Sequence, residues 1–240
     1  MDLNTYLSQE ASQVLFLQLL FKDAAPQVFL EIGACEGEDS IRYLNQFPEV
    51  NLFAFEPHPN NIKIIKRNFP LNSNPRFNLV ELAISDQVGI SKFYLSSGQP
   101  NHTEPSEGWD YGNKSSSLLA PSSLMEHFVP WLKFNNSIKV KTTTLQSLFE
   151  KYSRDWVDFL HMDVQGAELS VLRGGQHQLE RIRCIWLEIS FHEVYEGQSA
   201  PQEIDSLLTS KGFVKVLEKV DSGFGDRFYV NTRAFRITPS

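Results

Sequence analysis

Short apolar runs alternate with segments of helical spacing along most of this 240-residue chain. Strands that alternate with helices predict a mostly parallel sheet with helices on both faces, an α/β doubly wound architecture. The runs at 213–218 and 226–232 flank the turn DSGFGD and predict a closing hairpin that adds an antiparallel strand. The other predicted strands lie at 28–32, 51–56, 77–84, 88–95, 138–145, 157–164 and 184–190.

We expect one domain over residues 1–240, because no Pro/Gly/Ser-rich linker separates two halves that could each bury a core. Apolar positions of helical spacing predict an N-terminal helix within 1–25, and a further helix is expected at 168–179. The segment 96–137 is rich in Ser, Pro, Asn and Gly, and it is either a long disordered loop or a lid. Trp109 and Trp131 favour the lid, because disordered linkers are poor in aromatic residues.

The composition of the chain limits the kinds of ligand and partner that we expect. Asp and Glu number 29 against 22 Lys and Arg, and a net charge of −7 argues against a nucleic-acid partner. Cys35 and Cys184 are too few for a disulfide framework, and no Cys/His cluster suggests zinc. The polar N-terminus is unlike a signal peptide, and the early run VLFLQLLF is too short to cross a membrane. We expect a cytoplasmic protein without a membrane partner. The sequence is compatible with a homo-oligomer and does not decide the oligomeric state.

Carboxylates lie at or just beyond the carboxyl ends of five of the predicted strands. Ligands of open parallel sheets bind beyond the carboxyl ends of the strands, so these side chains would meet in one crevice. Such a negative crevice favours a ligand that carries positive charge and hydroxyl groups. The five residues are Glu31, Glu56, Asp86, Asp163 and Glu188.

The loop after the first strand reads GACEG and lacks the middle glycine of the dinucleotide fingerprint GxGxxG. Glu36, Glu38 and Asp39 stand where a pyrophosphate would bind, and like charge would oppose it. Glu56 lies at the spacing from Gly33 at which an acid accepts hydrogen bonds from ribose hydroxyls.

A nucleoside without phosphates that bears an ammonium and a sulfonium fits this pattern, and S-adenosylmethionine is such a molecule. An NAD-dependent oxidoreductase and a non-catalytic nucleoside-binding protein remain the alternatives. Glu31 and the glycine loop would face the methionine end, Glu56 the ribose, and Asp86 the adenine amino group. The expected cofactor-binding residues are Glu31, Gly33, Ala34, Gly37, Glu56, Pro57, Ser85, Asp86 and Asp163.

The blocks FLEIGACEGEDS, AFEP, LAISD, IKVKTTTLQSL and LHMDVQGAELSVLRGG resemble the FkbM-type S-adenosylmethionine-dependent methyltransferases over most of 27–218. That family usually has Asp, Asn and Glu where this chain has Glu31, Cys35 and Gln165. The resemblance implies the class I methyltransferase fold, with seven strands in the order 3-2-1-4-5-7-6 and strand 7 antiparallel. It also implies O-methylation of a hydroxyl on a sugar, polyketide or other small secondary metabolite, and hence a small-molecule or glycan acceptor.

Methyl transfer to a hydroxyl requires alignment, exclusion of water and a base that removes the proton. Asp163, at a strand tip, and His192, just beyond the next strand, are the expected catalytic residues. His161 lies deeper in an apolar strand, where a structural role is the more common one. We expect Glu188, His192 and Ser117 to bind the acceptor. We expect no metal, because no tight acidic triplet accompanies Asp163 and Glu188.

Overall fold

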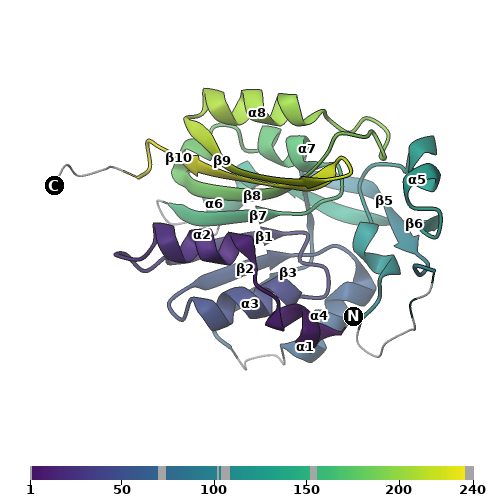
Figure 1. Cartoon of the computed structure of the whole chain (residues 1–240), viewed down its shortest axis with the longest axis horizontal. Coiled ribbons are helices and arrows are strands. Elements are labelled where there is room, and N and C mark those ends of the chain that lie inside the picture. Colours follow the sequence, from purple (N-terminus) through teal and green to yellow (C-terminus); the bar gives the residue numbers. More distant parts are fainter. Residues whose placement is uncertain (1, 70–73, 102, 104–108, 152–155, 236–240) are drawn as a thin grey trace.

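The computed structural model describes the whole chain except residues 1, 70–73, 102, 104–108, 152–155 and 236–240. A seven-stranded sheet runs through the molecule in the order β3-β2-β1-β7-β8-β10-β9 (Figure 1). Only β10 among these strands runs antiparallel to its neighbours, β8 and β9. This is the expected class I methyltransferase order, so the predicted fold is confirmed. The strands are β1 (Val28–Ile32), β2 (Asn51–Phe55), β3 (Phe77–Val80), β7 (Val157–Met162), β8 (Ile182–Ser190), β9 (Phe213–Asp221) and β10 (Phe224–Asn231).

Helices cover both faces of this sheet because alternate strand residues bury apolar side chains on opposite sides. On one face of the sheet, Leu160 and Ile185 belong to the core that α6, α7 and α8 cover. The other packs Phe29 and Phe159 against α2 and α3. The helices are α1 (Leu3–Ser8), α2 (Ser12–Leu20), α3 (Glu38–Gln46), α4 (Pro59–Asn68), α5 (Ser123–Phe128), α6 (Leu145–Lys151), α7 (Glu168–Arg173) and α8 (Pro201–Ser210), with 3-10 turns η1 (Gly112–Ser115) and η2 (Leu179–Arg181).

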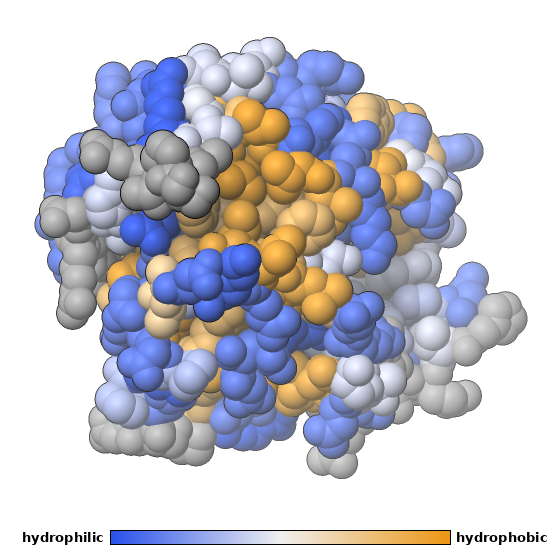
Figure 2. Space-filling view, turned by 60° about the vertical axis from the view of Figure 1, so that its left-hand side comes forward, coloured by the Kyte–Doolittle hydropathy of each residue, from blue (hydrophilic) through white to orange (hydrophobic). Residues whose placement is uncertain are grey.

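The N-terminal segment forms two helices where one was predicted. Gln9 and Ala11 have extended backbones, which separate α1 from α2. The break lets α1 lie on α3, where Arg42 donates a hydrogen bond to the Tyr6 carbonyl at 2.8 Å, while α2 buries Leu17. α2 also leaves Leu15 and Leu19 exposed. Figure 2 shows hydrophobic residues gathered on the side of the molecule that it brings forward.

A second, three-stranded sheet has the order β4-β6-β5, with β4 (Ala83–Ser85), β5 (Gly89–Ser97) and β6 (Lys133–Thr144). The strand predicted over 77–84 is therefore wrong as one element, since β3 and β4 belong to different sheets. The Leu82 amide donates to the Val80 carbonyl at 2.9 Å, and this tight turn redirects the chain. The helix predicted over 168–179 is also shorter than expected, because α7 ends before Gly174 and Gly175.

Much of the segment 96–137 has regular structure. It contains the end of β5, η1, α5 and the start of β6, while residues 102 and 104–108 lie outside the described part. Figure 1 shows this segment beside the carboxyl ends of the central strands. No helix of the described residues is long and apolar enough to cross a membrane.

Candidate active site

A cavity lies beyond the carboxyl ends of β1, β2 and β7, where the sequence predicts a ligand. Its wall contains six of the predicted residues together with side chains from the segment 96–137, among them Trp109, Asn113 and Lys114. The six are Glu31, Gly33, Ala34, Glu56, Pro57 and Asp163.

Gly33 lets β1 and β7 meet at the floor of this cavity. Its φ is +86°, and a Cβ added there would lie 1.8 Å from the Asp163 carbonyl oxygen. Only glycine fits such a close approach of two backbones. Gly37, with φ +84°, begins α3 and does not line the cavity.

Glu56 is buried at the tip of β2, and both of its oxygens accept backbone hydrogen bonds. Oε2 accepts from the Cys35 amide at 2.8 Å and Oε1 from the His58 amide at 2.7 Å. Burial raises the pKa of Glu56 to about 8 in spite of these bonds. With the Asn61 side chain as a third donor, these bonds still leave a lone pair of the carboxyl group for a ligand hydroxyl.

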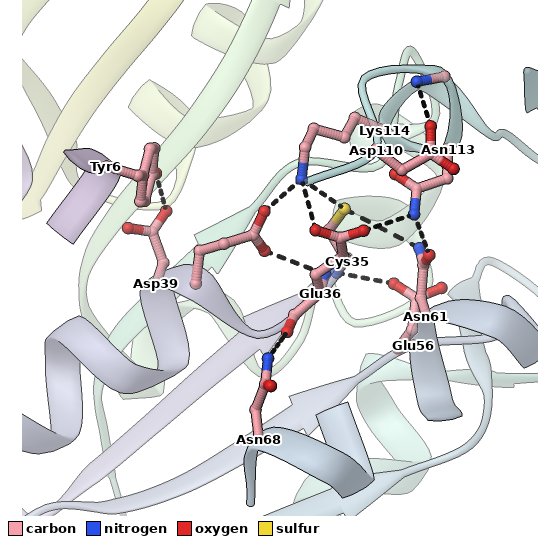
Figure 3. Close-up of polar contacts among 12 residues, drawn as sticks. Tyr6, Cys35, Glu36, Asp39, Glu56, Asn61, Asn68, Asp110, Asn113 and Lys114 are labelled. Atoms are coloured by element: carbon pink, nitrogen blue, oxygen red, sulfur yellow. Dashed lines mark hydrogen bonds and ion pairs between the residues drawn. The ribbon is translucent and has the colours of Figure 1, made fainter. Parts of the chain in front are cut away.

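The acids of the glycine loop have partners within the chain, which corrects their expected role (Figure 3). Lys114 Nζ forms ion pairs with Glu38 and, at 3.4 Å, with Glu36. Asp39 lies 3.5 Å from Arg42 Nε and accepts from the Tyr6 hydroxyl at 3.1 Å. These carboxylates therefore do not present an uncompensated negative surface to the ligand, and they argue less strongly against a pyrophosphate than expected.

Two further polar groups sit on the same face of the sheet. Glu31 accepts a short hydrogen bond from the Ser40 hydroxyl, and burial raises its pKa well above the usual range. His161 lines the cavity, and its Nδ1 lies 3.0 Å from the Tyr43 hydroxyl. Burial lowers the pKa of His161, so the ring is neutral near pH 7.

Gln165 joins two predicted carboxylates, Asp163 just after β7 and Glu188 near the carboxyl end of β8. Its Nε2 donates to Asp163 at 2.6 Å and to Glu188 at 2.7 Å, while the Tyr195 hydroxyl lies 2.9 Å from its Oε1. Burial, together with the charge of Asp163, raises the pKa of Glu188 well above the usual carboxyl range. Burial therefore favours the protonated form of Glu188.

A second cavity shares Gln165 in its wall with the first. Glu188 and Tyr195 give it polar lining, and Met125 and Phe224 are among its apolar residues. The two cavities thus meet at the residue that bridges Asp163 and Glu188.

Four predicted residues lie elsewhere. Ser85 and Asp86 line a separate hollow with Tyr94, although the preceding Ala83 lines the main cavity. The Ser117 hydroxyl is buried and donates to the Gln165 carbonyl at 2.8 Å. His192 stacks on Phe128 with ring centroids 4.2 Å apart and lines neither cavity. Asp163 lines the first cavity, whereas His192 does not.

Sequence reasoning missed Asn113, Lys114 and Tyr195, which all lie in or touch the two cavities. The positions of Asn113 and Lys114 depend on how the segment 96–137 folds back, and only the aromatic content of that segment signalled an ordered lid. Tyr195 lies in the connection after β8, where no sequence motif pointed to it. Within the described part of the chain, no three His, Cys, Asp or Glu side chains are arranged to hold a metal ion.

Glu168 gives the site a pH-dependent stability. Its Oε1 accepts from the Val164 amide at 3.1 Å, and burial raises its pKa to about 7. Because the pKa of Glu168 is higher in the folded protein than in the unfolded chain, protonated Glu168 stabilises the fold. This stabilisation is complete below pH 4.5, the pKa in the unfolded chain, and is lost as pH rises through about 7.

Glu168→Gln keeps the accepting oxygen and carries no charge at any pH. At about pH 8.5 we therefore expect its free energy of unfolding to exceed that of the unmodified protein by on the order of 3 kcal/mol. The gain should shrink towards zero at about pH 5. Chemical denaturation at both pH values checks this, with the exposed Glu49→Gln as control. An equal gain at both pH values would contradict the assignment.

Comparison with known proteins agrees with this geometry. The family model described as "Methyltransferase FkbM domain" matches residues 31–215. A curated relative, "2-O-methyltransferase NoeI" of Sinorhizobium fredii, is 36% identical over 184 residues, which are 76% of this chain and 71% of the relative. "Methyltransferase sdnD" of Sordaria araneosa is 24% identical over 192 residues, 77% and 72% of the two chains.

Among solved structures, a putative O-methyltransferase from Klebsiella pneumoniae aligns with a TM-score of 0.48 at 17% identity, covering 95% of this chain and 89% of that one. A precorrin-6y C5,15-methyltransferase from Geobacter metallireducens aligns with a TM-score of 0.45 at 14% identity, covering 93% and 89%. The family match and the 36% identical relative carry the conclusion. This chain belongs to the FkbM methyltransferase family, and S-adenosylmethionine is its methyl donor.

Proposed function

We propose that the protein methylates a hydroxyl of a sugar, or of another hydroxylated small molecule such as a polyketide. The observation that carries this proposal is the pair of cavities that share Gln165. One suits a nucleoside, and the other combines hydrogen-bonding groups with an apolar wall. The relative named a 2-O-methyltransferase supports oxygen as the methylated atom.

The first cavity fits S-adenosylmethionine by its own chemistry. Glu56 would accept from the ribose hydroxyls, and the neighbouring apolar residues Ala83 and Phe93 suit the adenine ring. Glu31 and the loop at Gly33 would face the methionine end. Because Ser85 and Asp86 lie outside this cavity, we no longer assign them to the adenine amino group. The bound cofactor supplies a methyl group that its sulfonium activates.

Asp163 is the proposed general base. It lines the cofactor cavity and is hydrogen-bonded through Gln165 to Glu188, which lines the second cavity. A hydroxyl that enters from the second cavity would pass its proton to the Asp163 carboxylate as the oxygen attacks. The neutral His161 also lines the cofactor cavity, whereas His192 is no longer assigned as a base.

The second cavity also limits the acceptor. Its lining residues in the described part of the chain include no Lys, Arg or His that could pair with a phosphate or carboxylate on the acceptor. Its apolar wall, which includes Met125, Val129 and Leu132, suits the apolar face of a sugar ring or a hydrocarbon. We therefore propose a neutral, hydroxylated acceptor.

Transfer of labelled methyl from S-adenosylmethionine into a panel of acceptors tests this function. We expect label in neutral sugars or polyketides, and at least about tenfold less in their phosphorylated counterparts. Label found only in amines would contradict O-methylation. Thermal stabilisation by S-adenosylhomocysteine without transfer to any acceptor would favour a non-catalytic binding protein.

A further inference from the structure

The stretch 109–114 of the inserted segment lies over the glycine loop and lines the cofactor cavity. Asn113 Nδ2 donates to Glu36 Oε1 at 2.9 Å and to Asn61 Oδ1 at 2.8 Å (Figure 3). The Lys114 ammonium pairs with Glu36 and Glu38 on the same loop. These contacts fix a segment distant in sequence against the predicted cofactor loop.

Two polar atoms of this stretch are buried without a hydrogen-bond partner among the described residues. They are the Asn113 amide oxygen, on a side chain only 6% exposed, and the Trp109 indole nitrogen. Both residues line the cofactor cavity. A buried polar atom without a partner destabilises the fold, so two on one cavity wall indicate a ligand that supplies their partners.

Each atom lies near a different part of the cavity. Asn113 contacts Asn61, and Asn61 lies on the helix that follows Glu56, the proposed ribose ligand. Trp109 packs on Tyr6 with ring centroids 5.4 Å apart, and Tyr6 is hydrogen-bonded to Asp39 at the start of α3, near Glu31. The Lys114 ammonium, 4.1 Å from the Trp109 ring centroid, holds the indole in place.

We infer that this stretch completes the cofactor site, with Asn113 accepting a hydrogen bond from the nucleoside half and the Trp109 N–H donating to the carboxylate of the amino-acid half. The inference rests on cofactor binding in the first cavity and not on the proposed acceptor. Binding measurements on the cofactor alone therefore separate its failure from a failure of the acceptor proposal.

The tryptophan is tested with two ligands, since 5′-methylthioadenosine lacks the amino-acid half of S-adenosylhomocysteine. Trp109→Phe keeps an aromatic ring for Lys114 and removes the N–H. We expect the Kd for S-adenosylhomocysteine to rise about tenfold or more, with 5′-methylthioadenosine unaffected. The control is Trp156→Phe, at an exposed tryptophan before β7. An equal change for both ligands, or for neither, overturns the role of Trp109.

The asparagine is tested by pairing Asn113→Ala with analogues of S-adenosylhomocysteine that lack one nucleoside donor each: 2′-deoxy, 3′-deoxy and inosine forms. Asn113→Ala should weaken the parent ligand about three- to tenfold. This loss of affinity should vanish for the one analogue that lacks the group donating to Asn113. The analogue therefore identifies that donor. The exposed Asn136→Ala should change none of these affinities. An undiminished penalty for all three analogues, or no penalty for the parent, overturns the role of Asn113.

Discussion

Replacing Asp163 by Asn is expected to lower kcat by about 10²- to 10⁴-fold, because the amide cannot take the proton from the acceptor hydroxyl. Asn retains an oxygen that can accept from Gln165 Nε2, which lies 2.6 Å from Asp163 Oδ1. We therefore expect the cavity to keep its shape, and the Kd for S-adenosylhomocysteine to rise by less than about tenfold. Single-turnover kinetics and calorimetric titration of the same variant measure the two quantities.

Glu188→Gln is the matched comparison for this variant. Burial favours the protonated form of Glu188, and an amide closely replaces that form. The Glu188 variant should change KM for the acceptor more than kcat, and its kcat should stay within about tenfold of the unmodified value. If Asp163→Asn retains full kcat, or if Glu188→Gln loses as much, Asp163 is not the base.

Gly33→Ala is the second variant with a large expected effect. The added methyl would lie 1.8 Å from the Asp163 carbonyl oxygen, so β1 and β7 have to separate. The left-handed backbone at Gly33 adds about 1–2 kcal/mol of strain for a residue with a Cβ. We expect the free energy of unfolding to fall by about 3 kcal/mol or more, and cofactor binding to weaken over about 100-fold.

Gly197→Ala separates the two causes. Gly197 also has a left-handed backbone, with φ +74°, but a Cβ added there meets nothing within 4 Å. This variant should lose only the backbone term of about 1–2 kcal/mol and should bind the cofactor normally. Thermal unfolding and titration with S-adenosylhomocysteine compare the pair. Similar losses in both variants would show that the close approach at Gly33 does not govern the site.

The central strands are the part of this fold that the sequence predicts best. β1, β2, β7 and β8 are mostly apolar runs, because both faces of these strands are covered, and such runs are recognisable without any tertiary information. The predicted strand at 77–84 fails for the same reason. Its apolar residues continue through the turn at Leu82, where the chain leaves one sheet for the other.

For the candidate site too, the residues at strand ends are predictable from the sequence, whereas those placed by tertiary contacts are not. Glu31, Glu56 and Asp163 are found from their places at strand ends, since topology brings those ends together. Asn113 and Lys114 could not be placed in this way, because their contacts with the glycine loop depend on how a long insertion folds back. His192 also follows a strand end, but its ring stacks on Phe128 and lines neither cavity. Position at the right edge of a sheet therefore predicts proximity but not the direction of a side chain.

A crystal structure of the protein with S-adenosylhomocysteine tests the central claim most directly. We expect the ligand in the first cavity, with its ribose hydroxyls on Glu56 and its amino-acid end near Glu31. Its sulfur should face Asp163 and Gln165, the residue that both cavities share. Ligand density outside this cavity, or a ribose that does not contact Glu56, would contradict the account.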